Sequence, residues 1–146
     1  MIDFAIIGHS NYSIGNIMNQ EIRYTENGNY LIGSVFTDPI NKIQKEAEDL
    51  SIPFPESLIH TFSDIPQMAF IYTVFVKDED RGLKIGKKLV NRFCWEAELM
   101  GAEKVVLFAD LNIEQNKGFK LLNFYKKQGF KHLETVNNYA FMTYNV

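Results

Sequence analysis

The chain has 146 residues, a length typical of one domain, and we expect residues 1–146 to form a single folded unit. A hydrophobic fraction of 46% is ordinary for a globular protein, and the net charge of −3 argues against non-specific binding to nucleic acid. The single cysteine excludes an internal disulfide, which fits a reducing compartment. No apolar stretch approaches the roughly 20 residues of a membrane span, and the first residues do not resemble a secretory signal. We therefore expect a cytoplasmic protein with no membrane segment.

The N-terminal part predicts strands and a tight hairpin. A strand is expected at residues 2–7, and the chain has room for a short helix at 12–19. Two β-rich runs, 21–24 and 30–36, then flank Asn27-Gly28. Asn-Gly between two such runs is the strongest short-range hairpin signal, because both residues tolerate positive φ angles.

The next part predicts one helix and one long loop. Residues 40–50 have the apolar spacing of a helix. Residues 51–66 contain three prolines and no convincing periodicity, so we expect a loop there. A loop of this length in a compact domain is either disordered or functional.

The most informative stretch joins a buried strand to a helix through a basic turn. Residues 70–76 are almost all β-branched or aromatic, which predicts a strand buried on both faces. Residues 85–100 have the spacing of a helix that buries one face. The first N–H groups of a helix lack intrahelical partners and carry partial positive charge, so an anion is expected there. Four cationic side chains would surround it: Arg81, Lys84, Lys87 and Lys88.

The turn differs from the two best-known nucleotide-binding loops. A Walker loop has Lys and then Ser or Thr after its last glycine, whereas Lys87 and Lys88 follow Gly86. A dinucleotide-binding fingerprint has three glycines at positions 1, 3 and 6, and this turn has only Gly82 and Gly86.

The turn resembles motif A of the Gcn5-related N-acetyltransferase (GNAT) superfamily. That motif is Arg or Gln, two residues, Gly, one residue, then Gly or Ala. Residues 81–86 lie on this pattern, with Arg81 first and Gly86 last, and Val76 precedes the arginine by five residues. Lys84 stands where the pattern has its first glycine, and Gly82 would supply backbone freedom in its place.

A second segment extends the resemblance. Residues 104–111 predict another buried strand, and 116–128 predict a helix that ends at Gly129. The helix ends in a Phe-Tyr pair followed three residues later by Gly-Phe, which is similar to motif B of the same superfamily. Together the two motifs cover about residues 70–133.

The resemblance implies a fold of the α/β (α+β) class. We expect a mixed, mostly antiparallel sheet of six or seven strands flanked by helices, with two central strands that splay apart near the motif A turn. The chain ends in two predicted antiparallel strands, 131–136 and 139–144, joined by Asn137-Asn138. Many superfamily members place two helices before the hairpin, where this chain has only about 20 residues.

The resemblance also implies an enzyme that transfers the acetyl group of acetyl-coenzyme A directly to a primary amine of a small molecule or protein. The pyrophosphate would bind at the turn, and the pantetheine arm would add to the backbone edge of the preceding strand. The residues expected to bind the cofactor are Phe75, Val76, Arg81, Gly82, Leu83, Lys84, Ile85, Gly86, Lys87, Asn112 and Asn116.

Tyr125 matches the motif B tyrosine that protonates the leaving thiolate in many members, so we expect it to be the catalytic acid. Cys94 lies inside a predicted helix and is expected to be a buried structural thiol rather than a nucleophile. The base is not assigned, because the central strand has no carboxylate and Asp110 and Glu114 are more typical of solvated or capping residues. The three histidines lack metal-ligand spacing, so no metal site is expected.

Two alternatives to the catalytic N-acetyltransferase stay open. One is a coenzyme A-binding module that has kept the fold but not catalysis. The other is a toxin-like modifier of a macromolecule, which the lysines near the second helix would serve, although a solvated helix face explains them as well. The acceptor pocket is expected to involve residues 10–19 and 51–66, with surface padding as the alternative for the second range. Exposed sheet edges are compatible with a homodimer.

Overall fold

The computed structural model describes residues 3–10, 19–80, 84–112 and 120–146, the first of these ranges by its backbone. The strands are β1 (Asp3–Ser10), β2 (Asn19–Glu26), β3 (Asn29–Thr37), β4 (Gln67–Phe75), β5 (Lys104–Asp110), β6 (Lys131–Val136) and β7 (Tyr139–Asn145). The helices are α1 (Pro39–Asp49), α2 (Glu56–Phe62), α3 (Ile85–Leu99) and α5 (Leu121–Lys127), with a short 3₁₀ helix η1 (Asp78–Asp80).

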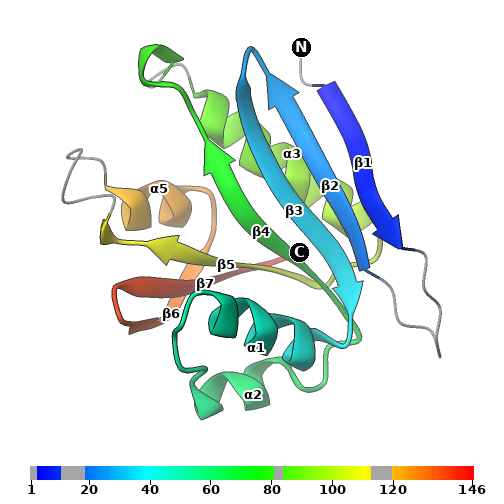
Figure 1. The fold of residues 1–146 in the computed structure, drawn as a ribbon, viewed down its shortest axis with the longest axis vertical. Coiled ribbons are helices and arrows are strands. Elements are labelled where there is room, and N and C mark those ends of the chain that lie inside the picture. The colour runs from blue at the N-terminus through cyan, green and yellow to red at the C-terminus, as the bar shows by residue number, and fades with distance from the viewer. Residues whose placement is uncertain (1–2, 11–18, 81–83, 113–119) are drawn as a thin grey trace.

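The strands form one seven-stranded sheet in the order β1-β2-β3-β4-β5-β7-β6 (Figure 1). Every neighbouring pair is antiparallel except β4 and β5, which are parallel. A parallel pair needs a crossover, and α3 provides it between β4 and β5. The predicted mixed, mostly antiparallel sheet of six or seven strands is confirmed.

Two tight hairpins are closed by residues with positive φ. Asn27 (φ 52°) and Gly28 (φ 83°) join β2 to β3, and Asn137 (φ 49°) and Asn138 (φ 65°) join β6 to β7. Positive φ at both central residues matches the twist of the flanking strands. The hairpin predicted at Asn27-Gly28 and the pair of C-terminal strands are therefore confirmed.

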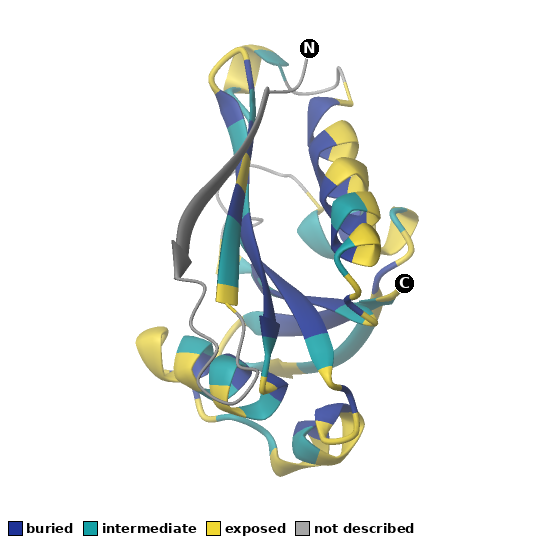
Figure 2. Cartoon of the chain, turned by 90° about the vertical axis from the view of Figure 1, so that its right-hand side faces the viewer, coloured by how far each residue is buried: buried dark blue, intermediate teal, exposed yellow. Residues whose placement is uncertain are grey.

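One face of the sheet is covered by α3 and α5. Leu89, Phe93 and Ala97 recur at every fourth residue of α3 and are fully buried against the sheet, while the outer side of the helix is exposed (Figure 2). Gly33 in β3 permits this close approach. A Cβ atom at that position would lie 2.4 Å from the Phe93 ring and 2.7 Å from the carbonyl oxygen of Phe70.

The other face is covered over part of its length by α1 and α2 (Figure 1). Ile43 and Ala47 of α1 pack with Leu58 and Phe62 of α2 and with Phe70 of β4. The pair of helices follows the β2–β3 hairpin and precedes β4. None of the helices in the described ranges is long and apolar enough to cross a membrane.

The prediction of an unbroken loop at 51–66 is wrong, because α2 occupies residues 56–62. The helix is only two turns long and shows just two buried apolar positions, Leu58 and Phe62, one turn apart. A pattern of that length cannot be distinguished from chance in the sequence. Tertiary packing supplies the stability that so short a helix lacks by itself.

Two other boundaries differ from the prediction. The helix expected at 116–128 starts at Leu121, because Lys120 has non-helical angles (φ −87°, ψ 85°). Gly129 has φ 100° and follows that helix, as expected of a left-handed C-terminal cap. The short helix expected at 12–19 falls largely on residues outside the described ranges, and Asn19 itself begins β2.

Candidate active site

The two central strands separate halfway along the sheet. β4 and β5 pair only from Met68–Ile71 to Lys104–Leu107, although β4 continues to Phe75 and β5 to Asp110 (Figure 1). Beyond that point β4 pairs with β3 and β5 pairs with β7. The described residues place no strand against the second edge of 72–75, so an extended ligand could add to its N–H and C=O groups. The predicted splay is confirmed.

The separation corrects the prediction that 70–76 is buried on both faces. Phe70 and Ile71 are buried, but Thr73 and Phe75 are exposed. The first half of β4 pairs with β5 and is covered by helices on both faces of the sheet. The second half does not pair with β5. The apolar run in the sequence gives no sign of the residue at which the neighbouring strand β5 separates from β4.

A β-bulge lies where the strands separate. Ile32 pairs with Thr73 and Gly33 pairs with Ile71, so Tyr72 has no partner on β3. A bulge bends a strand and re-aims its side chains and backbone groups. The Tyr72 hydroxyl lies 2.8 Å from Oγ of Ser34, and the ammonium group of Lys42 lies 5.2 Å from the centre of the Tyr72 ring. These contacts fix Tyr72 on the face that α1 and α2 cover.

The N-terminus of α3 is open to an anion. No side chain of the described residues caps it, and its first turn contains no acidic residue. The Lys88 N–H donates to the Lys84 carbonyl at 3.1 Å, which leaves the N–H groups of Ile85, Gly86 and Lys87 without an intrahelical acceptor. Together with the helix dipole, these groups favour an oxyanion.

Lys84 has the backbone conformation that glycine adopts most readily. Its φ and ψ are 61° and 22°, in the left-handed region. For a residue with a side chain this conformation costs roughly 1–2 kcal/mol. The lysine at this motif A position therefore has a conformation that glycine adopts readily, and its exposed cationic side chain belongs to the residue that caps the helix.

Gly86 brings the motif A and motif B segments together. A Cβ atom at Gly86 would lie 3.2 Å from the Phe124 ring and 3.4 Å from Cγ2 of Val76. The end of β4, the first turn of α3 and α5 therefore meet at this glycine. The sequence signals of 76–86 and 123–130, about 40 residues apart, describe one site.

Tyr125 extends from α5 into the apolar cluster beneath this site. Its ring lies 5.0 Å from that of Phe124 and 5.6 Å from that of Phe130. Burial raises the pKa of the Tyr125 hydroxyl, so the group stays protonated and can only donate its proton or accept a hydrogen bond. Cys94 is buried as predicted, and burial raises its pKa to about 12, which disfavours the thiolate.

Other residues singled out from the sequence make contacts of their own. The Asp110 carboxylate accepts the N–H of Asn112 at 3.0 Å, and the side-chain oxygen of Asn112 accepts the amide of Asn138 at 3.3 Å. The Asp110 side chain thus bonds the backbone two residues further on, and Asn112 joins the β6–β7 turn to the end of β5. Lys88 was expected to face the anion, but its ammonium lies 3.1 Å from Glu26, and this hydrogen bond lowers the pKa of Glu26.

Five candidate residues lie outside the described ranges: Arg81, Gly82, Leu83, Glu114 and Asn116. The sequence interpretation missed Tyr72 as a bulge and Asn29 as a buried link to the segment after β4. A bulge depends on the register of two strands, which no local pattern reveals. Within the described residues, no group of three His, Cys, Asp or Glu side chains could hold a metal ion.

Comparison with known families places the chain in one of them. The model of the acetyltransferase (GNAT) domain matches residues 56–132, more than half of the chain. The chain therefore belongs to this family of acetyltransferase domains, and the resemblance drawn from motifs A and B is confirmed. No curated protein matches the chain significantly.

Solved structures agree on the fold. PaiA N-acetyltransferase from Thermoplasma acidophilum, in complex with coenzyme A, shares 16% identity over 86% of this chain and 60% of its own, with a TM-score of 0.52. Chaetomium thermophilum Naa20, in complex with a bisubstrate analogue, shares 17% identity over 86% of this chain and 65% of its own, with a TM-score of 0.55. Arabidopsis thaliana NAA60, in complex with acetyl-CoA, shares 15% identity over 100% of this chain and 99% of its own, with a TM-score of 0.53. The chain thus spans about 60% of the first of these proteins, and at such identities the likeness shows the fold alone.

Proposed function

We propose that this chain transfers the acetyl group of acetyl-coenzyme A directly to the primary amine of a small molecule or a protein. One observation carries the proposal. Among the described residues, the edge of β4 at 72–75 has no second partner strand and the N-terminus of α3 has no side-chain cap, so a peptide-like arm could bind at the edge and an anion at the helix terminus. Membership of the acetyltransferase domain family supports the reaction type.

The described residues divide the binding of the cofactor between two elements. The backbone of Phe75 and its neighbours in β4 would hold the pantetheine arm. The N–H groups of Ile85, Gly86 and Lys87 would hold the pyrophosphate, and the ammonium groups of Lys84 and Lys87, both exposed, would balance its charge. We extend the same role to Arg81, Gly82 and Leu83 by the motif A pattern, and a supporting role to Val76, Asn112 and Asn116.

The reaction needs one proton donor from the chain. The amine nitrogen attacks the thioester carbonyl carbon, the C–S bond breaks, and the leaving thiolate takes a proton from the Tyr125 hydroxyl. The amine loses a proton to water, and the tyrosinate regains one from solvent, so that protons balance over the cycle. No covalent acyl-enzyme is needed, in agreement with the buried thiol of Cys94.

The acceptor would approach from the face covered by α1 and α2. The opposite face of the sheet is covered by α3 and α5, and we assign the binding of the cofactor to these two helices and the end of β4. Aromatic side chains, namely Phe70, Tyr72, Phe108 and Phe141, pack in series on the acceptor side, with ring centres 4.3 to 5.2 Å apart. Ser57 of α2 donates to Glu134 of β6 at 3.1 Å. This contact joins α2 to the edge strand β6, and we propose that part of 51–66 walls the acceptor pocket.

The test is acetyl-CoA-dependent turnover with a panel of amines, followed by release of the free thiol of coenzyme A. Lys87→Glu reverses a charge at the third position of α3 and is expected to raise the KM for acetyl-CoA about tenfold or more, because the new carboxylate repels the pyrophosphate. The same carboxylate suits the helix dipole, so the variant should not be less stable than the wild type.

Lys45→Glu is the matched control, since it makes the same charge change on the exposed side of α1. Its KM for acetyl-CoA should equal that of the wild type. Binding of acetyl-CoA without turnover of any amine would favour the non-catalytic module. Absence of both binding and turnover in folded protein would refute the proposal.

A further inference from the structure

A buried asparagine links the β2–β3 hairpin to the segment that follows β4. Asn29 is 0% exposed. Its Oδ1 accepts the backbone N–H of Lys77 at 2.7 Å, and its Nδ2 donates to Oδ2 of Asp80 at 2.8 Å. The partners are 48 and 51 residues away, so these bonds tie together two distant parts of the chain. A buried amide with both ends satisfied fixes the position of whatever it bonds.

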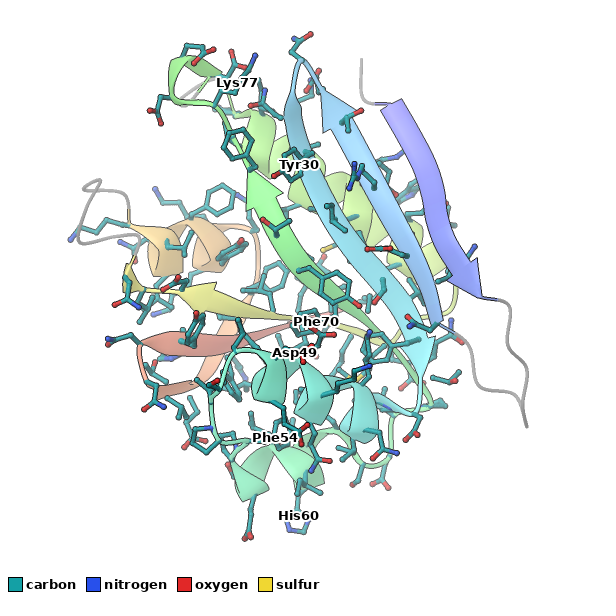
Figure 3. The ribbon with its side chains drawn as sticks, viewed as in Figure 1. Tyr30, Asp49, Phe54, His60, Phe70 and Lys77 are labelled. Atoms are coloured by element: carbon teal, nitrogen blue, oxygen red, sulfur yellow. The ribbon has the colours of Figure 1, made fainter. Side chains whose placement is uncertain are left out.

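The same hairpin also contacts α3. Glu26, which is buried, receives the ammonium group of Lys88 at 3.1 Å. The hairpin therefore holds the chain just after β4, through Asn29, and again at the second turn of α3, through Glu26. Figure 3 shows Lys77 and Tyr30 toward the same end of the sheet, where Tyr30 pairs with Phe75 at the end of β4.

The bond to Asp80 also has an electrostatic consequence. Asp78, Glu79 and Asp80 form η1, immediately before the basic turn, and a free carboxylate there would repel a pyrophosphate. Asp80 bonds to Asn29 and lies 3.6 Å from the ammonium group of Lys77. These contacts hold the Asp80 carboxylate at the hairpin and balance its charge.

We propose that Asn29 is a positioning residue for the cofactor: by fixing the Lys77 N–H and the Asp80 carboxylate, it holds residues 77–80, which follow β4, in place at the β2–β3 hairpin. Asn29 itself does not touch the ligand. The inference rests on the proposed function, because it assumes that coenzyme A binds at that terminus. Its physical basis is preorganisation: when a binding site is already ordered, no binding free energy is lost in ordering it.

The test measures the Kd for coenzyme A and the melting temperature of each variant. Asn29→Asp places a carboxylate against that of Asp80, at a contact that is 2.8 Å long in the wild type, and the two repel each other. We therefore expect the Kd for coenzyme A to rise about tenfold or more while the protein stays folded. Adding Asp80→Asn should restore the Kd to within about threefold of the wild type. In the double variant the new carboxylate at 29 accepts from both the Lys77 N–H and the new amide at position 80.

Asn41→Asp is the matched control. Asn41 donates to Asp38 at 2.7 Å at the start of α1, so the substitution makes the same chemical change away from the cofactor. Its Kd for coenzyme A should not change. A lower melting temperature for Asn29→Asp together with a wild-type Kd would mean that Asn29 is only structural, and the proposal would be wrong.

Asp80→Ala keeps the test decisive if Asn29→Asp does not fold. Electrostatics alone predict that removing the Asp80 carboxylate tightens binding of the anion or, because Lys77 balances its charge, leaves it unchanged, whereas losing the partner of Asn29 weakens binding. We expect the Kd to rise about threefold or more, and a tighter or unchanged Kd would overturn the inference. Failure of the wild type to bind coenzyme A would instead refute the proposed function, so the two failures are distinguishable.

Discussion

At the scale of single residues, the environment of Tyr125 determines the protonation state of its hydroxyl. The sequence supplies a tyrosine after a phenylalanine, and the fold buries its ring among Phe124 and Phe130. Burial disfavours the charged form and raises the pKa of the hydroxyl, so the group is protonated at neutral pH. A tyrosine in an apolar stripe is by default a core side chain. Removing its hydroxyl while keeping its ring distinguishes a core role from that of a catalytic acid.

We therefore expect Tyr125→Phe to lower kcat by about 10² or more, because general acid catalysis contributes factors of this order. The KM for acetyl-CoA should stay near that of the wild type, since the ring and its packing are retained. Tyr144→Phe is the control, because the Tyr144 ring packs on Phe130 in the same cluster, 5.4 Å away. Equal kcat values for the two variants would remove Tyr125 from the mechanism.

Lys84 shows how a departure from a sequence motif can be absorbed by the backbone. The residue type gives no indication of a left-handed conformation, yet φ is 61° there. Lys84 is the N-cap of α3, and the strain of its angle is of the size that folded proteins tolerate at single positions. The motif pattern predicted the position, and the tertiary structure determined how a lysine fills it.

At the scale of elements, the packing of α3 against the sheet depends on Gly33 in β3. The Phe93 ring occupies the space that a side chain at Gly33 would need. Periodicity predicted which face of α3 is buried, since its apolar positions recur at helical spacing. It did not predict which strand residue the helix would rest on, because that depends on how two distant segments approach.

Gly33→Ala should lower the free energy of unfolding by about 1–3 kcal/mol, the usual range for an overpacked core. The Phe93 ring could move, but the Phe70 carbonyl belongs to the paired strand β4 and cannot move far. Urea unfolding followed by circular dichroism would measure the change. A variant as stable as the wild type would show that α3 packs less closely on β3 than the structure indicates.

The short helix α2 illustrates the limit of local signals. Long, periodic elements such as α3 and the hairpin strands could be predicted, because each repeats its pattern several times. In α2 the pattern has two members, Leu58 and Phe62, and three prolines nearby favour a loop. The helix forms because both side chains find space under α1 and over the sheet.

At the scale of the whole molecule, the proposed cofactor would contact elements that only the fold brings together. The end of β4, the start of α3 and the side chains of α5 meet around Gly86. A ligand bound there stabilises the folded state alone, since the unfolded chain has no such site. The effect should therefore appear in the stability of the entire domain.

We expect acetyl-CoA at about 100 times its Kd to add about 2.7 kcal/mol to the free energy of unfolding. For a domain of this size that corresponds to a rise in melting temperature of several degrees. The rise should saturate with concentration, and it should be reduced at equal concentration for Lys87→Glu. No rise at millimolar acetyl-CoA in folded wild-type protein would contradict the proposed site.

The sequence by itself determined the class of fold and the family, because motifs A and B are local patterns whose residues lie close together in the chain. It also determined the hairpin at Asn27-Gly28 and the buried face of α3, for which short-range geometry suffices. Only the tertiary structure decided where β5 leaves β4, the bulge at Tyr72 and the contacts of Asn29. Each of these depends on the register or approach of segments that are distant in sequence, and no local propensity encodes such a relation.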